Sequence, residues 1–177
     1  MQAGCDAIAL ADNSLAILRV SNRAIGAMLK ERFGITPLLH MSCRDRNLLV
    51  LQSELLAMAA LGMRHVFPLT GDPARVGDHP GAASVYDVNS VQLNAIAKRM
   101  NEGFNHAGKS LSSPTQFVVG CTLDPNSKNI AAQNLETRAE DRGARAGHLS
   151  TGPLGCRTNV HSVLQLQPAV YASATLN

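Results

Sequence analysis

The sequence predicts an α/β fold built on a parallel sheet, and three observations support this. Short apolar runs typical of buried strands alternate with longer segments of helical periodicity, as in consecutive βαβ units. The 177 residues are 45% hydrophobic and 16% charged, which is ordinary for a globular domain with one core. Aromatic residues make up only 3%, so we expect a mainly aliphatic core.

The first two units are each a strand, a polar loop and a helix. Residues 4–13 form an apolar run closed by Asp and Asn, and Ser21 then offers an N-cap for a helix that ends at Gly34. Residues 35–41 form the second apolar run. A polar loop at 42–47 leads to a periodic segment at 48–61 that ends at a glycine.

Two further units follow in the same pattern. The run at 64–70 leads into a glycine- and aspartate-rich loop and then into helical periodicity from residue 88 to about 104. The run at 115–121 is followed by a loop and a helix candidate at 130–140. Polar residues therefore gather after each strand, the ligand-binding side of a (β/α)8 barrel and also of an open doubly wound sheet. About four such units are too few for a closed barrel, which has about 250 residues.

Composition argues against several classes of protein. The net charge is +3 with dispersed Lys and Arg, so nucleic-acid binding is not indicated. The four cysteines contain no CxxC pair, and we expect no metal site. No run is long enough for a membrane span, and no secretory signal opens the chain. We expect a cytoplasmic protein with free thiols.

Four linked motifs carry a family resemblance. They are Ala-Asp-Asn at 11–13, Leu-His-Met-Ser-Cys-Arg-Asp-Arg-Asn at 39–47, Leu-Thr-Gly-Asp-Pro at 69–73 and Val-Tyr-Asp-Val-Asn-Ser at 85–90. In order and spacing, residues 4–138 closely resemble methylenetetrahydrofolate reductase. The nearest subgroup is the bacterial one whose reductase domain is often fused behind a homocysteine methyltransferase domain.

The resemblance implies a parallel (β/α)8 TIM barrel, present here as an incomplete one of about four βα units. It also implies FAD as cofactor, NADH or NADPH as reductant, and a folate substrate. The family reduces 5,10-methylenetetrahydrofolate to 5-methyltetrahydrofolate, and the flavin carries the hydride. A homo-oligomeric full-length parent is expected.

The first part of the implied cofactor site comes from the first two units. Ala11, Asp12 and Asn13 match the segment whose backbone lies along the flavin in the family. His40 matches a histidine at the end of a barrel strand that contacts the cofactor.

The second part comes from the third unit. Thr70, Gly71 and Asp72 match the triplet beneath the flavin ring, where Asp72 is the expected catalytic residue facing both flavin and folate. Tyr86 matches an aromatic residue on the far portion of the cofactor.

Three further matches lie later in the chain. Cys121 occupies a position that can be tyrosine in the family, and Asp124 one that can be histidine. Arg138 falls where a cationic residue approaches the cofactor phosphates.

Simpler interpretations stand beside these. Gly71, Asp72 and Pro73 alone would be an ordinary turn. His40 alone would more often be a satisfied core histidine, and Tyr86 could merely pack a loop. The charges at 44–46 could equally be a solvated cluster.

Two expectations limit the resemblance. The family's general acid is a glutamate on the first strand, and the chain opens on what resembles the second strand, so this residue is absent. Glu31, Glu54 and Glu102 lie in helical segments and are poor substitutes. The missing residue predicts an incomplete fragment that is poorly active by itself. The exposed strand edges and smaller core of an incomplete barrel predict marginal stability.

The end of the chain departs from the family. We expect a partial reductase barrel over residues 1–146 and an irregular, unrelated tail over 147–177. One hypothesis is that the tail is a frameshift product, with the break between Thr137 and Ser150. Two alternatives to the reductase remain at this point: a non-catalytic remnant that binds flavin or folate weakly, and a flavin-free pterin-binding barrel of the methyltransferase type.

Overall fold

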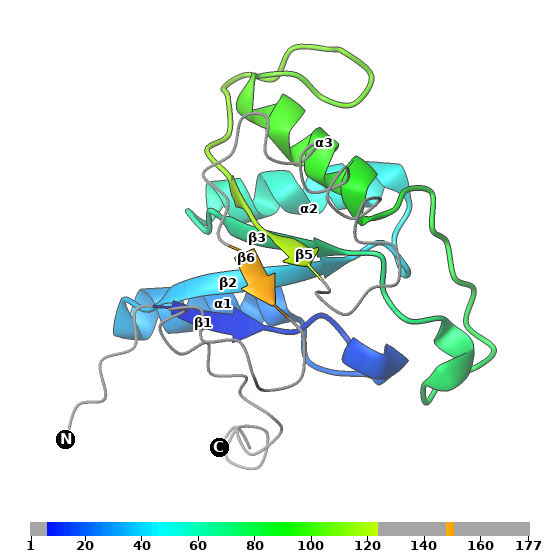
Figure 1. Cartoon of the computed structure of the whole chain (residues 1–177). Helices are drawn as coiled ribbons and strands as arrows, with labels where there is room; N and C mark the ends of the chain where they lie inside the picture. The colour runs from blue at the N-terminus through cyan, green and yellow to red at the C-terminus, as the bar shows by residue number, and fades with distance from the viewer. Residues whose placement is uncertain (1–6, 124–147, 151–177) are drawn as a thin grey trace.

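The α/β fold class is confirmed in the computed structural model, which describes residues 7–123 and 148–150 (Figure 1). Four strands form one sheet: β1 (Ala7–Leu10), β2 (Thr36–Ser42), β3 (His65–Leu69) and β4 (Val118–Val119). Three helices separate them: α1 (Asn22–Phe33), α2 (Leu48–Ala60) and α3 (Ser90–Asn101). Two short 3-10 segments lie in the loops, η1 (Ser14–Ala16) and η2 (Ala74–Val76).

The strand order identifies the sheet as part of a barrel. The strands lie in the order β1-β2-β3-β4 and every pair is parallel. A doubly wound sheet reverses its strand order at a switch point, whereas a (β/α)8 barrel adds each strand beside the last. The described strands therefore have the arrangement of one part of a (β/α)8 barrel.

The core lies on one face of this sheet. Leu10 is in register with Leu39, Leu39 with Val66, and Val66 with Val119, so the four side chains form a row across the strands. All four belong to one buried cluster with residues of α2 and α3. Burying an aliphatic side chain contributes about 1.5–3 kcal/mol, so this row and the helices packed on it hold the sheet together.

Local sequence explains where the helices begin. The side chain of Asn47 accepts a hydrogen bond of 2.9 Å from the amide of Val50 and so caps α2. Asn89 and Gln92 form a reciprocal capping box at the start of α3. Ser21 precedes α1 as expected, but its side chain makes no capping hydrogen bond.

The fourth strand is shorter than the apolar run at 115–121 predicts. The side chain of Asn101 takes the place of a strand neighbour: its Oδ1 accepts from the Phe117 amide at 2.7 Å and its Nδ2 donates to the Phe117 carbonyl at 2.9 Å. Only Val118 and Val119 pair with β3, and the chain then continues as β5 (Cys121–Leu123).

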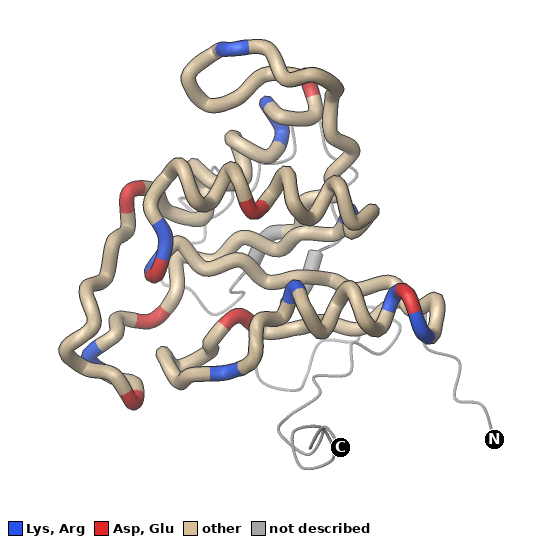
Figure 2. The backbone as a smooth tube through the Cα atoms, turned by 180° about the vertical axis from the view of Figure 1, so that it is seen from behind, with Lys and Arg blue, Asp and Glu red and all other residues tan. Residues whose placement is uncertain are grey.

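A second small sheet involves the last part of the chain. β5 pairs in parallel with β6 (His148–Ser150), which lies within the predicted tail. The remainder of that tail and the helix candidate at 130–140 lie outside the described residues, so the domain boundary at 146 stays a prediction. In the described part of the chain, basic and acidic residues are interspersed (Figure 2), and no helix there is long and apolar enough to cross a membrane.

Candidate functional site

The predicted site segments meet at the carboxyl edge of the sheet. Residues 11–13 follow β1, His40 lies near the end of β2, and residues 70–72 follow β3. Because Leu10 pairs with Leu39 and Ser42 with Leu69, these strand ends are adjacent. The short segments η1 (dark blue) and η2 (green) belong to the first and third of these loops. Figure 1 shows both of them at the same end of the strands.

Asp12 is buried and its carboxylate is fully engaged within the protein. It accepts two hydrogen bonds from the Arg46 guanidinium, at 2.6 and 3.0 Å, and one from the Ser42 amide at 2.9 Å. Arg46 also lies 3.0 Å from a carboxylate oxygen of Glu54, which pairs with Arg23 at 2.8 Å. The Asp12 side chain therefore fixes the first two loops.

The loop at 42–47 corrects one interpretation of the sequence. Arg44 and Arg46 are not a solvated cluster, because the side chain of Arg44 is 3% exposed and that of Arg46 is 11% exposed. Arg44 donates from Nε and Nη2 to the two carboxylate oxygens of Asp45 at 2.6 and 2.7 Å. This paired hydrogen bond lowers the pKa of Asp45 and raises the pKa of Arg44, so both remain charged.

The loop after β3 is shaped by Gly71. Its φ of +91° is in the left-handed region, and a Cβ there would lie 2.3 Å from the Ser42 hydroxyl oxygen. Only glycine at position 71 allows the third loop to approach Ser42 of the second loop this closely. In the same loop, the Thr70 hydroxyl accepts from the Ser90 amide at 3.2 Å and so fixes the start of α3.

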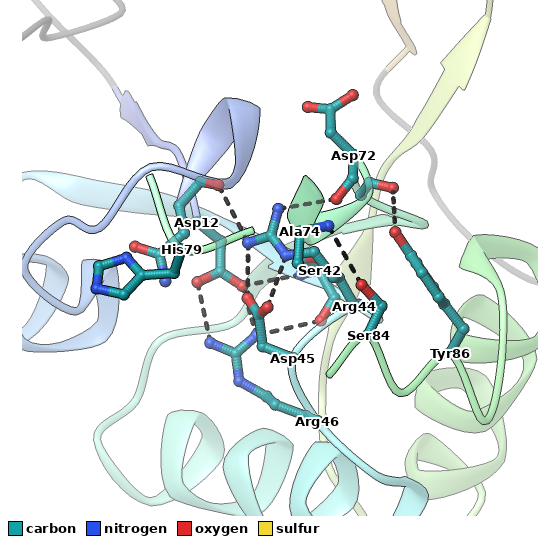
Figure 3. A network of polar contacts seen from close by, with 12 residues as sticks. Asp12, Ser42, Arg44, Asp45, Arg46, Asp72, Ala74, His79, Ser84 and Tyr86 are labelled. Carbon is teal, nitrogen blue, oxygen red and sulfur yellow. Dashed lines mark hydrogen bonds and ion pairs between the residues drawn. The ribbon is translucent and has the colours of Figure 1, made fainter. Parts of the chain in front are cut away.

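Asp72 makes two different contacts. Its backbone carbonyl accepts from Arg44 Nη1 at 3.1 Å, and its carboxylate Oδ2 accepts from the Leu15 amide at 3.2 Å. Figure 3 shows the carboxylate pointing away from the Arg44 guanidinium. Asp72 is exposed, so the carboxylate is accessible at the edge where the loops meet.

Tyr86 lines an open cleft of about 460 Å³ beside this loop. Its hydroxyl donates to the Gly71 carbonyl at 3.0 Å, which ties the tyrosine to the third loop. The cleft lies between the end of β3 and the start of α3, and its walls are formed by Thr70, Gly71, Pro73, Tyr86, Val88, Asn89 and Gln92. Thr70, Gly71 and Tyr86 are thus brought into one cavity.

His40 lies on the other side of β2 from the core row. Its ring packs against Phe67 at 5.1 Å between centroids, and its Nε2 is buried with no hydrogen-bond partner among the described residues. Burial lowers the pKa of His40 below its ordinary value of 6.5, against a smaller opposing effect of Asp12. The imidazole is therefore neutral near pH 7, and its Nε2 is unpaired within the described part of the chain.

Backbone strain is concentrated at the same edge. Asn13, Leu15 and Ala16 in the first loop have φ of 44°, 57° and 55°, and Tyr86 has φ of 49°. These are the only non-glycine residues with positive φ among those that the structure describes. Such conformations cost about 1–3 kcal/mol each and tend to cluster at functional sites.

Three predicted residues cannot be placed from their side chains. Cys121 lies in β5, but its side chain is not described, and Asp124 and Arg138 lie outside the described residues. Cys43 is a buried free cysteine whose pKa burial raises to about 11, so it is not a nucleophile near neutral pH. Within residues 7–123 and 148–150, no group of His, Cys, Asp and Glu side chains is arranged to hold a metal ion.

Comparison with known proteins supports the resemblance seen in the sequence. A family model described as methylenetetrahydrofolate reductase matches residues 4–107. The chain belongs to the methylenetetrahydrofolate reductase family. The match runs from the start of the first unit to just beyond α3, and it includes all four motifs, the last of which contains Tyr86. A comparison with curated proteins finds no match to the chain.

Two residues that organise the site escaped the sequence interpretation. Asn22, the first residue of α1, donates from Nδ2 to the carbonyls of Leu10 and His40 at 3.0 and 2.8 Å. It ties the ends of β1 and β2 to one helix. Arg44 is the other: it belongs to the motif at 39–47, but its burial was not predicted, because its only local signal is the following aspartate, which also suits a surface ion pair.

Proposed function

We propose that the chain is a flavin-dependent reductase of 5,10-methylenetetrahydrofolate that uses NADH or NADPH and forms 5-methyltetrahydrofolate. Membership of a family of folate reductases supports the reaction class. The observation that carries the proposal is the convergence of the motif segments at one sheet edge, where an accessible carboxylate stands beside an open cleft.

The residues present fit a flavin on two counts. The Nε2 of His40 is a buried polar atom without a partner among the described residues. The cleft joins an aromatic ring, that of Tyr86, to polar groups at the start of α3. A flavin requires such a mixture of apolar walls and a few placed polar atoms.

Each side chain has a distinct task in this proposal. When bound, the flavin supplies hydride transfer between the nicotinamide and the folate. The backbone at 11–13, His40, Thr70, Gly71 and Tyr86 would hold it. Asp72 would accept hydrogen bonds from the pterin of the folate and place a negative charge beside the reacting rings. Cys121, Asp124 and Arg138 complete the predicted contacts.

A general acid is not evident among the described glutamates. Glu54 is paired with Arg23 and Arg46 at 2.8 and 3.0 Å, and it lies in α2 rather than in the carboxyl-edge loops. Glu31 and Glu102 lie at the ends of α1 and α3. Proton transfer to the folate during ring opening therefore needs a group other than these three.

The test is reconstitution with FAD followed by anaerobic addition of NADH or NADPH. Yellow protein that bleaches with the nicotinamide and recovers colour with methylenetetrahydrofolate supports the reductase. Yellow protein that does not bleach indicates a non-catalytic remnant. Protein without colour refutes flavin binding, and a folate titration then separates a weak remnant from a pterin-binding barrel.

Two matched variants locate the folate contact. Asp72→Asn removes the charge of the accessible carboxylate, so we expect the bound flavin to be retained and its reoxidation by folate to slow. Asp78→Asn is the control, since Asp78 also accepts from a first-loop amide, that of Leu18 at 3.1 Å, but lies farther along the loop. Equal reoxidation rates for the two variants would argue against a role for Asp72. Homo-oligomer formation, fusion to a methyltransferase domain and cytoplasmic location stay predictions.

A further inference from the structure

Arg44 lies where three loops of the carboxyl edge meet. It follows β2, and β2 lies between β1 and β3 in the sheet. Its side chain is 3% exposed, so the guanidinium is covered by the loops around it and is not a surface charge. A buried guanidinium is stable only when its charge is paired and its N–H groups are satisfied.

The guanidinium is shared between the neighbouring loops. Nη1 donates to the backbone carbonyl of Asp72 at 3.1 Å, and Nη2 donates to the backbone carbonyl of Asn13 at 3.2 Å. Asp45 occupies the remaining side of the fork and balances the charge. The planar group therefore sets the relative position of the first and third loops, as Figure 3 shows for the third.

The backbone of Arg44 extends this connection to the segment before Tyr86. The Arg44 carbonyl accepts from the Val85 amide at 2.7 Å, and the Arg44 amide donates to the Ser42 hydroxyl at 3.2 Å. One residue thus contacts the segments that carry Asn13, Asp72 and Tyr86. A lysine has three donors on a single nitrogen and cannot reproduce the fork to both carbonyls and the carboxylate.

We propose that Arg44 is a positioning residue that couples the first and third loops, so that loss of its fork releases Asn13 and Asp72 together. It acts through the backbone of these residues and is too buried to meet a ligand itself. The coupling is a property of the protein alone. Its consequence for flavin and folate binding rests on the proposed function.

The first test measures amide hydrogen exchange of the full chain carrying Arg44→Lys. We expect exchange in residues 13–19 and 72–79 to rise together by at least about tenfold, the effect of losing one hydrogen bond to a charged group. Arg23→Lys is the matched control, because Arg23 is also a largely buried arginine of this region but pairs with Glu54. Faster exchange in only one loop, in neither loop, or equally in the control would overturn the coupling.

The second test is a titration of the same variants with FAD. We expect Arg44→Lys to weaken binding by at least about tenfold and Arg23→Lys to leave it within about twofold. Unchanged FAD affinity in Arg44→Lys, despite released loops, would overturn the positioning role. If the unsubstituted chain binds no FAD, the proposed function fails, while the exchange data still decide the coupling.

A third variant covers the case in which Arg44→Lys does not fold. Asp45→Asn keeps the guanidinium but weakens the ion pair that orients it. We expect a smaller rise of exchange that again affects both loops together. No change in either loop would count against Arg44 as the link between them.

Discussion

The contact between η1 and η2 gives the sharpest quantitative prediction, through Gly77. A Cβ at Gly77 would lie 1.9 Å from the carbonyl oxygen of Ala16 and 2.4 Å from its carbonyl carbon. The φ of Gly77 is −99°, which any residue can adopt. Gly77→Ala therefore tests steric exclusion alone, without a conformational penalty.

The size of the effect follows from the distance. Ordinary contact begins near 3.4 Å, so the two loops must separate by about 1.5 Å to admit the methyl group. The obstructing atoms are backbone and cannot rotate away. Overpacking of this kind costs about 1–3 kcal/mol, and we expect the upper part of that range.

Gly81→Ala is the matched control in the same loop. A Cβ at Gly81 has nothing within 4 Å and its φ is not left-handed, so alanine there should be neutral or stabilise by up to about 1 kcal/mol. Urea unfolding of both variants followed by circular dichroism gives the difference. Free energies of unfolding within about 0.5 kcal/mol of each other would refute the close contact of the loops.

Three further predictions concern the core, a helix cap and pH. Leu39→Ala, in the middle of the core row, should cost about 2–5 kcal/mol in urea unfolding, whereas Leu49→Ala, at a residue 74% exposed, should change stability by less than about 0.5 kcal/mol. Asn89→Ala removes the capping box of α3 and should cost about 1 kcal/mol by the same measurement; no loss would mean that the cap is made by other groups. Because the folded pKa of His40 is below 6.5, the unfolded chain binds its proton more readily, and stability falls as the pH drops below about 6.5. His40→Gln should make this fall shallower, and a slope equal to that of the unsubstituted chain would show that His40 is not buried neutral.

Much of the fold could be predicted from the sequence because its signals are local. The apolar run at 35–41 and the periodic segment at 48–61 correspond to β2 and α2 within one or two residues. The fourth strand could not be placed as well. The Asn101 side chain takes up the backbone groups of Phe117, and that competition depends on the three-dimensional position of α3.

The position of the candidate-site segments in the fold could be predicted, but the contacts between them could not. The position of residues 70–72 after a strand is a sequence property, and the structure places them at the carboxyl edge as expected. The burial of Arg44 depends on carbonyl groups about 30 residues away in either direction. Nothing local marks such an arginine as buried, and the left-handed Leu15 likewise has no residue preference that announces it.

The shared contacts of Arg44 and the tight packing of Gly77 on Ala16 have a consequence for engineering. In barrel folds the βα loops are commonly exchanged one at a time to alter specificity, since each usually rests on the scaffold independently. Here the loops after β1, β2 and β3 form one unit, because two carbonyls share one guanidinium and a glycine faces a neighbouring backbone. A graft from a relative would need to transfer all three loops together, and an insertion in one would need a compensating change in another.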